Sequence, residues 1–230
     1  MQKIQEIHFE TLPSTSTFAK ENAHLLTVPS MIVANHQSAG RGRRGNSFYS
    51  PADTGLYMTV VFDAPDDCSM VTPAAAVAVC RCLKKHGIDP KIKWVNDIFV
   101  NGLKVCGILS EMIVNETKRY VSVGIGINLT TTEVPSELFM AGSLGIKCNK
   151  KVLANEIAQM LLNCCDTDNK TIINEYRDLL FVIGKEIRYS KNNEEFSAVV
   201  SDINSNCNLV VIRSDGTEDI LSSGEISIKI

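Results

Sequence analysis

The chain has 230 residues, of which 44% are apolar and 21% charged, and its formal net charge is −3. This composition fits one large domain, or one domain with a small appended module. The acidic balance excludes a general nucleic-acid-binding surface, and no apolar run reaches the roughly 18 residues of a membrane span. Charged residues stand where a signal peptide needs an apolar segment, so we expect a cytoplasmic protein.

The first third of the chain predicts strands and helices in alternation. After Ser14, whose hydroxyl can cap a helix, apolar residues recur at helical spacing up to Leu26. A second helix is predicted over residues 74–83, because Pro73 stands where the first turn of a helix tolerates proline. Strands are predicted over residues 4–9, 31–35 and 56–62.

The middle of the chain predicts neighbouring strands joined by a tight hairpin. Asn101 and Gly102 form the strongest short hairpin signal, because both residue types adopt the positive φ that such turns need. Gly124 and Gly126 interrupt the last strand, which indicates close approach of a ligand or of another backbone. The strands are predicted over residues 92–96, 98–100, 105–114 and 120–129.

The C-terminal part predicts two helices and then a small β module. The helices are expected over residues 151–162 and 172–181, with Asn149 as a cap of the first. From residue 184 onward, short alternating strands are separated by turns such as Asp215–Gly216, so we divide the chain into residues 1–183 and 184–230. The module's strands are predicted over residues 187–189, 196–201, 209–212 and 226–230.

The eight cysteines lack the spacing of a disulfide framework or of a zinc site. There is no Cys-x-x-Cys pair; Cys80 and Cys82 stand two residues apart, and Cys164 and Cys165 are adjacent. Several, such as Cys106, lie within apolar periodic segments, and the four histidines are scattered. We therefore expect buried or half-buried free thiols in a reducing compartment.

A loop with the sequence Gly-Arg-Gly-Arg-Arg-Gly, residues 40–45, carries the clearest functional signal. Glycine lets the backbone approach a ligand closely, and arginine offers a rigid fork of donors that matches phosphate and carboxylate oxygens. Because this positive charge is local in a net-negative chain, it indicates a small anionic ligand. A solvated basic turn, or an Arg/Gly contact to nucleic acid, is the alternative interpretation.

A second polar segment, Lys93-Trp94-Val95-Asn96-Asp97, precedes Lys104-Val105-Cys106-Gly107-Ile108-Leu109. Taken singly these are weak signals, because a lysine beside a turn is usually exposed and Asn-Asp is common in turns. In order and spacing, however, the Gly/Arg loop and these segments resemble the biotin protein ligase family. Two departures stand out: Val95 replaces a usual proline, and Phe48 replaces a frequent tryptophan.

The resemblance implies an α+β fold, in which a mixed β-sheet packed with helices forms a class II synthetase-like biotin/lipoate ligase domain. A small C-terminal SH3-like β-barrel would follow it. By the same resemblance, residues 37–51 fold over biotin and its adenylate, and Arg43 and Lys104 are catalytic. The residues implied to bind biotin are Ser14, Thr15, Ser16, Gln37, Gly40, Arg41, Gly42, Lys104, Gly107, Gly124 and Gly126.

The nucleotide is expected beside biotin in the same site. Mg²⁺ would arrive with ATP, near Asn96 and Asp97, and no residue is expected to hold a metal tightly on its own. Phe48 could cover the adenine. The residues implied to bind the nucleotide are Arg41, Arg43, Arg44, Phe48, Asn96, Asn128 and Lys229.

The implied reaction joins biotin and MgATP into biotinyl-5′-AMP and then transfers biotin to a lysine of a biotin carboxyl carrier domain of a carboxylase. We expect a monomer or weak homodimer, with no membrane association. Because no segment long enough for a DNA-binding domain precedes the first strand, we expect no specific DNA binding. A lipoate or octanoate transferase of the same fold, a non-catalytic RNA-binding protein and an inactive biotin-binding relative remain the alternatives.

Overall fold

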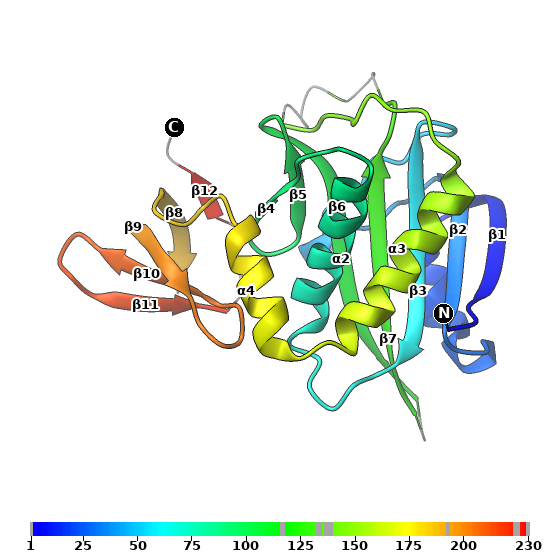
Figure 1. Cartoon of the computed structure of the whole chain (residues 1–230), viewed down its shortest axis with the longest axis horizontal. Helices are drawn as coiled ribbons and strands as arrows, with labels where there is room; N and C mark the ends of the chain where they lie inside the picture. Colours follow the sequence, from blue (N-terminus) through cyan, green and yellow to red (C-terminus); the bar gives the residue numbers. More distant parts are fainter. Residues whose placement is uncertain are drawn as a thin grey trace.

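The computed structural model describes residues 2–115, 118–131, 135, 140–191, 194–222 and 226–228. A seven-stranded mixed sheet forms its centre, in the order β1-β2-β3-β7-β6-β5-β4 (Figure 1). Only β1 and β2 pair in parallel; the other neighbours are antiparallel. The strands are β1 (Gln5–Leu12), β2 (Ser30–Gln37), β3 (Gly55–Asp63), β4 (Lys91–Lys93), β5 (Asp97–Val100), β6 (Leu103–Val114) and β7 (Arg119–Asn128).

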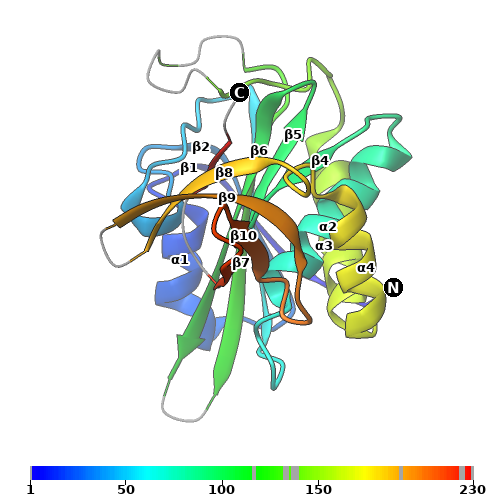
Figure 2. The same ribbon diagram turned by 90° about the vertical axis from the view of Figure 1, so that its left-hand side faces the viewer.

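Helices cover both faces of this sheet. The helix α1 (Thr15–Asn22) lies on one face, and α2 (Val71–Lys85), α3 (Lys150–Cys165) and α4 (Asn169–Leu179) lie on the other (Figure 2). The alanine-rich α2 is buried along most of its length, since small side chains let α3 and α4 pack closely against it. Within the described ranges, each helix is too short or too polar to span a bilayer.

The predicted helix caps are confirmed, but the first helix is shorter than its apolar pattern suggested. Ser14 Oγ accepts a hydrogen bond from Thr17 N at 3.4 Å, and Asn149 Oδ1 accepts from the first turn of α3. The helix α1 gives way after Asn22 to a 3₁₀ turn, η1 (Ala23–Leu25). Leu25 is 72% exposed, so its hydrophobicity does not extend the buried helical face.

The strand predicted over residues 92–96 was too long. The strand β4 ends at Lys93, and a turn that contains a cis Trp94–Val95 peptide leads directly into β5. Polar contacts hold this turn: the Trp94 indole donates to the carbonyl of Cys207 at 2.9 Å, and Asn96 Nδ2 donates to that of Ile108 at 2.7 Å. The predicted hairpin turn at residues 101–102, in contrast, is confirmed by its two positive φ angles.

The C-terminal module is an antiparallel sheet in the order β11-β10-β9-β8-β12. Among the described residues its edge strands, β11 and β12, do not pair with each other, so the expected SH3-like module is a five-stranded antiparallel sheet without a closing strand pair. The strand β11 was missed, although the turn that produces it, Asp215–Gly216, was predicted. The strands are β8 (Glu186–Lys191), β9 (Glu194–Ile203), β10 (Leu209–Arg213), β11 (Glu218–Leu221) and β12 (Ile226–Ile228).

Candidate functional site

A cavity of about 340 Å³ opens where α1, the Gly/Arg loop, the turn after β4 and the strands β6 and β7 meet. Most of the residues expected to bind ligand line it, although they come from segments more than 100 residues apart. The predicted residues in its wall are Ser14, Thr15, Ser16, Gln37, Arg41, Gly42, Arg43, Arg44, Phe48, Asn96, Asp97, Lys104, Gly107, Gly124 and Gly126.

Two of the predicted residues that the structure describes are not part of this wall. Gly40 lies behind it, where a Cβ would meet the Phe48 carbonyl oxygen at 2.3 Å, so glycine is needed for the loop's own fold. Asn128 donates from Nδ2 to the carbonyl of Gly142 at 2.9 Å, and its buried Oδ1 has no partner within the described structure. Lys229 lies outside the described residues.

One group in the cavity consists of hydroxyls and an amide. Gln37 Oε1 accepts from the backbone N–H of Thr15 at 2.9 Å, and Gln37 Nε2 donates to Ser50 Oγ at 2.8 Å. Thr59, on β3, donates to Thr15 Oγ1 at 2.8 Å and lies 3.3 Å from Ser16 Oγ. No role was predicted for Ser50 and Thr59, because each orients a residue of another segment, 13 and 44 positions away in the chain.

Glycines of neighbouring strands leave a flat surface at the back of the cavity. Gly107 on β6 pairs with Gly126 on β7, and a Cβ at either would contact the Phe48 ring, at 3.2 and 2.4 Å. A Cβ at Gly124 would meet Ser16 Oγ at 2.5 Å. A ligand or another backbone was predicted to approach Gly124 and Gly126 closely; in the structure the groups that approach are side chains, Ser16 at Gly124 and the Phe48 ring at Gly126.

The cations of the cavity are held by polar partners. The Arg41 guanidinium bonds both oxygens of Glu111, at 2.8 and 2.9 Å, and Arg43 Nη1 donates to Asn96 Oδ1 at 3.1 Å. Lys104 Nζ lies 2.7 Å from Asp97 Oδ1. Because these side chains are partly exposed, an anion in the cavity can compete for their donors.

Some wall residues were not predicted. Lys93, at the end of β4, adds a further positive charge, while Met58 and Ile226 add apolar surface. Ile226 belongs to β12, so the C-terminal sheet contributes to the cavity. Only the position of Lys93 directly before the Trp94–Asp97 turn could have indicated its role from the sequence.

The cysteines largely follow the expectation of free thiols. Burial raises the pKa of Cys80 to about 12 and that of Cys106 well above its usual value, so neither is a thiolate near neutrality. Cys148 is also a free thiol, but it is exposed and so departs from the expected burial.

Comparison with known proteins is consistent across sequence and structure. The model of the biotin/lipoate A/B protein ligase family matches residues 8–128, and that of the biotin protein ligase C-terminal domain matches residues 182–229. The bifunctional ligase/repressor BirA of Bacillus subtilis is 36% identical over 168 residues, which cover 69% of this chain and 51% of the relative. The chain thus spans about half the length of the first relatives it matches.

Two further similarities extend over most of the chain. The biotin–[acetyl-CoA-carboxylase] ligase of Mycobacterium tuberculosis is 26% identical over 214 residues, covering 85% of this chain and 77% of that relative. The solved structure of a biotin protein ligase from Aquifex aeolicus in complex with biotin and ATP has a TM-score of 0.85 and covers 98% of both chains. At 21% sequence identity, this last similarity establishes the fold.

Proposed function

The chain belongs to the biotin/lipoate A/B protein ligase family, and we propose that it is a biotin protein ligase. The observation that carries the proposal is that one cavity combines the hydroxyl and amide group around Gln37 with the cations Arg43 and Lys104. The first group suits a neutral polar ring, and the second suits a carboxylate beside a phosphate. Biotin and ATP together present these chemical groups.

The biotin ring would lie against Gly124 and Gly126, where the strands lack side chains. Its ureido group would bond residues 14–16 and Gln37, which are already oriented by Ser50 and Thr59. Its carboxylate would then point toward Lys104. This placement requires the Phe48 ring to move away from Gly126, and a loop side chain can do so by rotation.

In the first half-reaction, a carboxylate oxygen of biotin attacks the α-phosphorus of ATP, and the bond to pyrophosphate breaks. Negative charge on the phosphate oxygens is stabilised by Lys104 and Arg43, which sit in the cavity before reaction begins. The protein needs no nucleophile of its own, because the substrate supplies it. Catalysis therefore consists of positioning and charge neutralisation.

The oxygen atoms of Asn96 and Asp97 fit a Mg²⁺ ion that arrives with ATP. Mg²⁺ prefers oxygen ligands and usually binds one or two carboxylates together with substrate phosphates. Asp97 Oδ1 is 2.7 Å from Lys104 Nζ and Asn96 Oδ1 is 3.1 Å from Arg43 Nη1, so both acceptors lie beside the proposed phosphate site. When bound, the ion would neutralise phosphate charge.

In the second half-reaction, the neutral ε-amine of a lysine on a carrier domain attacks the acyl carbon of biotinyl-5′-AMP. An amide bond forms, AMP leaves and the amine loses a proton. We propose a biotin carboxyl carrier domain of a carboxylase as the acceptor, because the relative from Mycobacterium tuberculosis is named for that activity.

Two observations favour biotin ligation over the alternatives. The first family model covers both biotin and lipoate ligases, but the C-terminal match is to biotin protein ligases alone. Against an RNA-binding role, the Arg41 guanidinium is engaged by Glu111, and the Gly/Arg loop faces a cavity rather than forming a continuous basic surface.

The test is exchange of labelled pyrophosphate into ATP, with biotin, lipoate and octanoate as parallel substrates. Exchange that depends on biotin alone supports the proposal. Exchange with lipoate or octanoate instead identifies the related acyl ligase, and no exchange with any acid contradicts an adenylating enzyme. Transfer to a purified carrier domain then tests the second half-reaction separately.

A further inference from the structure

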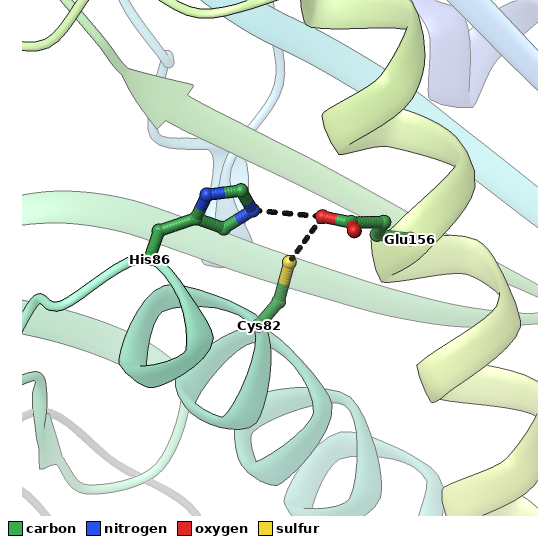
Figure 3. Close-up of side chains that lie close together, drawn as sticks. All are labelled: Cys82, His86 and Glu156. Carbon is green, nitrogen blue, oxygen red and sulfur yellow. Dashed lines mark hydrogen bonds and ion pairs between the residues drawn. The ribbon is translucent and has the colours of Figure 1, made fainter.

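A cluster of metal-ligating side chains lies on the helical face of the sheet, on the side opposite to α1. Cys82 lies in the last turn of α2 and His86 directly follows the last residue of that helix, so the two, four residues apart, project to the same side, and Glu156 faces them from α3 (Figure 3). One sulfur, one ring nitrogen and one carboxylate oxygen lie within 4.8 Å of one another. Among the described residues, this is the one group of three His, Cys, Asp or Glu side chains with that geometry.

The Cys82 and His86 side chains converge on the same oxygen atom of Glu156. His86 Nε2 lies 2.7 Å from Glu156 Oε2, and Cys82 Sγ donates to that oxygen at 3.9 Å (Figure 3). In a tetrahedral zinc site with bonds of about 2.0–2.3 Å, neighbouring ligand atoms are about 3.3–3.6 Å apart. The observed N···O distance of 2.7 Å is shorter than this range and the S···O distance of 3.9 Å is longer. Small side-chain rotations would therefore place the three atoms around one ion.

The surroundings also suit a metal. Lys85 Nζ bonds the other oxygen of Glu156, Oε1, so Oε2 faces only the two other members of the cluster and can serve as a ligand atom. Cys82 is buried, whereas the His86 and Glu156 side chains are 37% and 23% exposed, which leaves one side of the cluster accessible to water and to an entering ion.

We propose that Cys82, His86 and Glu156 form a Zn²⁺ site that joins α2 to α3, with water in the fourth position. A mixed sulfur, nitrogen and oxygen ligand set favours zinc over Mg²⁺ or Ca²⁺, which take oxygen ligands. On binding, the Cys82 thiol loses its proton to solvent and becomes the thiolate ligand. The spacing of cysteines had argued against a metal site, because the third ligand is a glutamate 74 residues away in the chain.

The site is tested by titrating the full chain, freed of metal with a chelator and kept reduced with a phosphine, with Co²⁺ and Zn²⁺. We expect one equivalent of Co²⁺ to give a thiolate-to-metal charge-transfer absorption and the intense visible bands of a tetrahedral ion. Zn²⁺ should displace it. At a Zn²⁺ concentration 100 times the Kd, the midpoint of thermal unfolding should rise by about 5–10 °C.

The ligand assignment is tested with Cys82→Ser, His86→Gln and Glu156→Gln. Each should weaken Co²⁺ binding by at least about 100-fold, because even residues that merely orient a ligand contribute 10–100-fold. His86→Gln and Glu156→Gln alter partly exposed side chains. These two variants therefore still test the ligand assignment if the Cys82→Ser variant, which alters a buried residue, fails to fold. Cys68→Ser is the matched control, since it removes a half-buried thiol that bonds the carbonyl of Pro65, outside the cluster.

Absence of the thiolate band in the wild-type chain would overturn the proposal. So would affinities of His86→Gln and Glu156→Gln for Co²⁺ within a few-fold of wild type, or a loss of Co²⁺ binding in Cys68→Ser that matches the loss in Cys82→Ser. None of these readouts involves biotin or ATP, so the result is independent of the proposed ligase activity.

Discussion

The Arg41 guanidinium and the Glu111 carboxylate form a bidentate ion pair, with N···O distances of 2.8 and 2.9 Å. Arg41 belongs to the Gly/Arg loop and Glu111 to β6, so the pair fastens the loop to the sheet at the edge of the cavity. Both side chains are partly exposed, which limits such a pair to about 1 kcal/mol. The loop is therefore held weakly enough for a bound anion to compete with Glu111.

We expect Glu111→Gln to loosen the Gly/Arg loop, because the amide cannot bind the guanidinium through two charged oxygens. A loss of at most about 1 kcal/mol corresponds to an increase of up to about fivefold in the open population. Trypsin cleavage after Arg41, Arg43 or Arg44, followed by mass spectrometry, should accelerate by a similar factor. Asp202→Asn, which breaks the ion pair between Arg177 on α4 and Asp202 on β9, should leave cleavage of the loop unchanged. Equal cleavage in Glu111→Gln and wild type would contradict the role of the Arg41–Glu111 pair.

Lys104→Ala should slow formation of biotinyl-5′-AMP by roughly 10²–10³, if the ammonium stabilises charge that develops on the phosphate. Single-turnover rates at saturating biotin and ATP measure this step directly. Lys91→Ala removes an exposed lysine of β4 that is absent from the cavity wall, and it should keep the wild-type rate. A wild-type rate in Lys104→Ala would remove this residue from the mechanism.

Gly124→Ala should destabilise the protein by about 1–3 kcal/mol, the range for overpacking a buried site. The new Cβ would lie 2.5 Å from Ser16 Oγ, and Ser16 is buried on α1 with little room to move. Urea unfolding measures the change. Ser16→Ala removes the clashing oxygen, so the double variant should recover part of the loss; strictly additive effects would show that the two residues do not interact.

Asp219 makes the stability of the C-terminal sheet sensitive to acid. Hydrogen bonds from Lys191, Tyr189 and Arg213 lower the pKa of its carboxyl from 3.8 to about 2. Because the folded-state pKa is lower, the stabilisation is fully present above the unfolded value and is lost as the pH falls from 3.8 toward about 2. The ionised carboxylate is the form that the three donors stabilise.

Asp219→Asn should therefore lower the unfolding midpoint at neutral pH. The difference from wild type should shrink as the pH falls through the interval between the two pKa values, as thermal unfolding across a pH series will show. Glu218→Gln, an exposed neighbour on β11, is the control and should follow the wild-type curve. A constant difference at every pH would mean that Asp219 stabilises the sheet by packing instead of charge.

Local sequence was sufficient for most elements of the fold. Ser14 and Asn149 cap helices as predicted, and Asn101–Gly102 forms its hairpin turn, since capping and turn geometry involve residues within a few positions of one another. Prediction from local sequence failed where a contact with a distant part of the chain sets the end of an element. The end of β4 is an example, because the Trp94 indole there donates to a carbonyl of the C-terminal module. The short strand β11 was missed for a similar reason, because its partner β10 defines it.

The sequence by itself determined which residue types this protein brings to its ligand: a Gly/Arg loop, the lysine after a hairpin and glycines within a strand. Only the tertiary structure decided that Glu111 holds Arg41, that Thr59 orients Thr15 and that Lys93 joins the cavity wall. It likewise placed Glu156 against His86. Such pairings depend on which elements pack together and in what register, and that is set by the whole core rather than by any segment's own pattern.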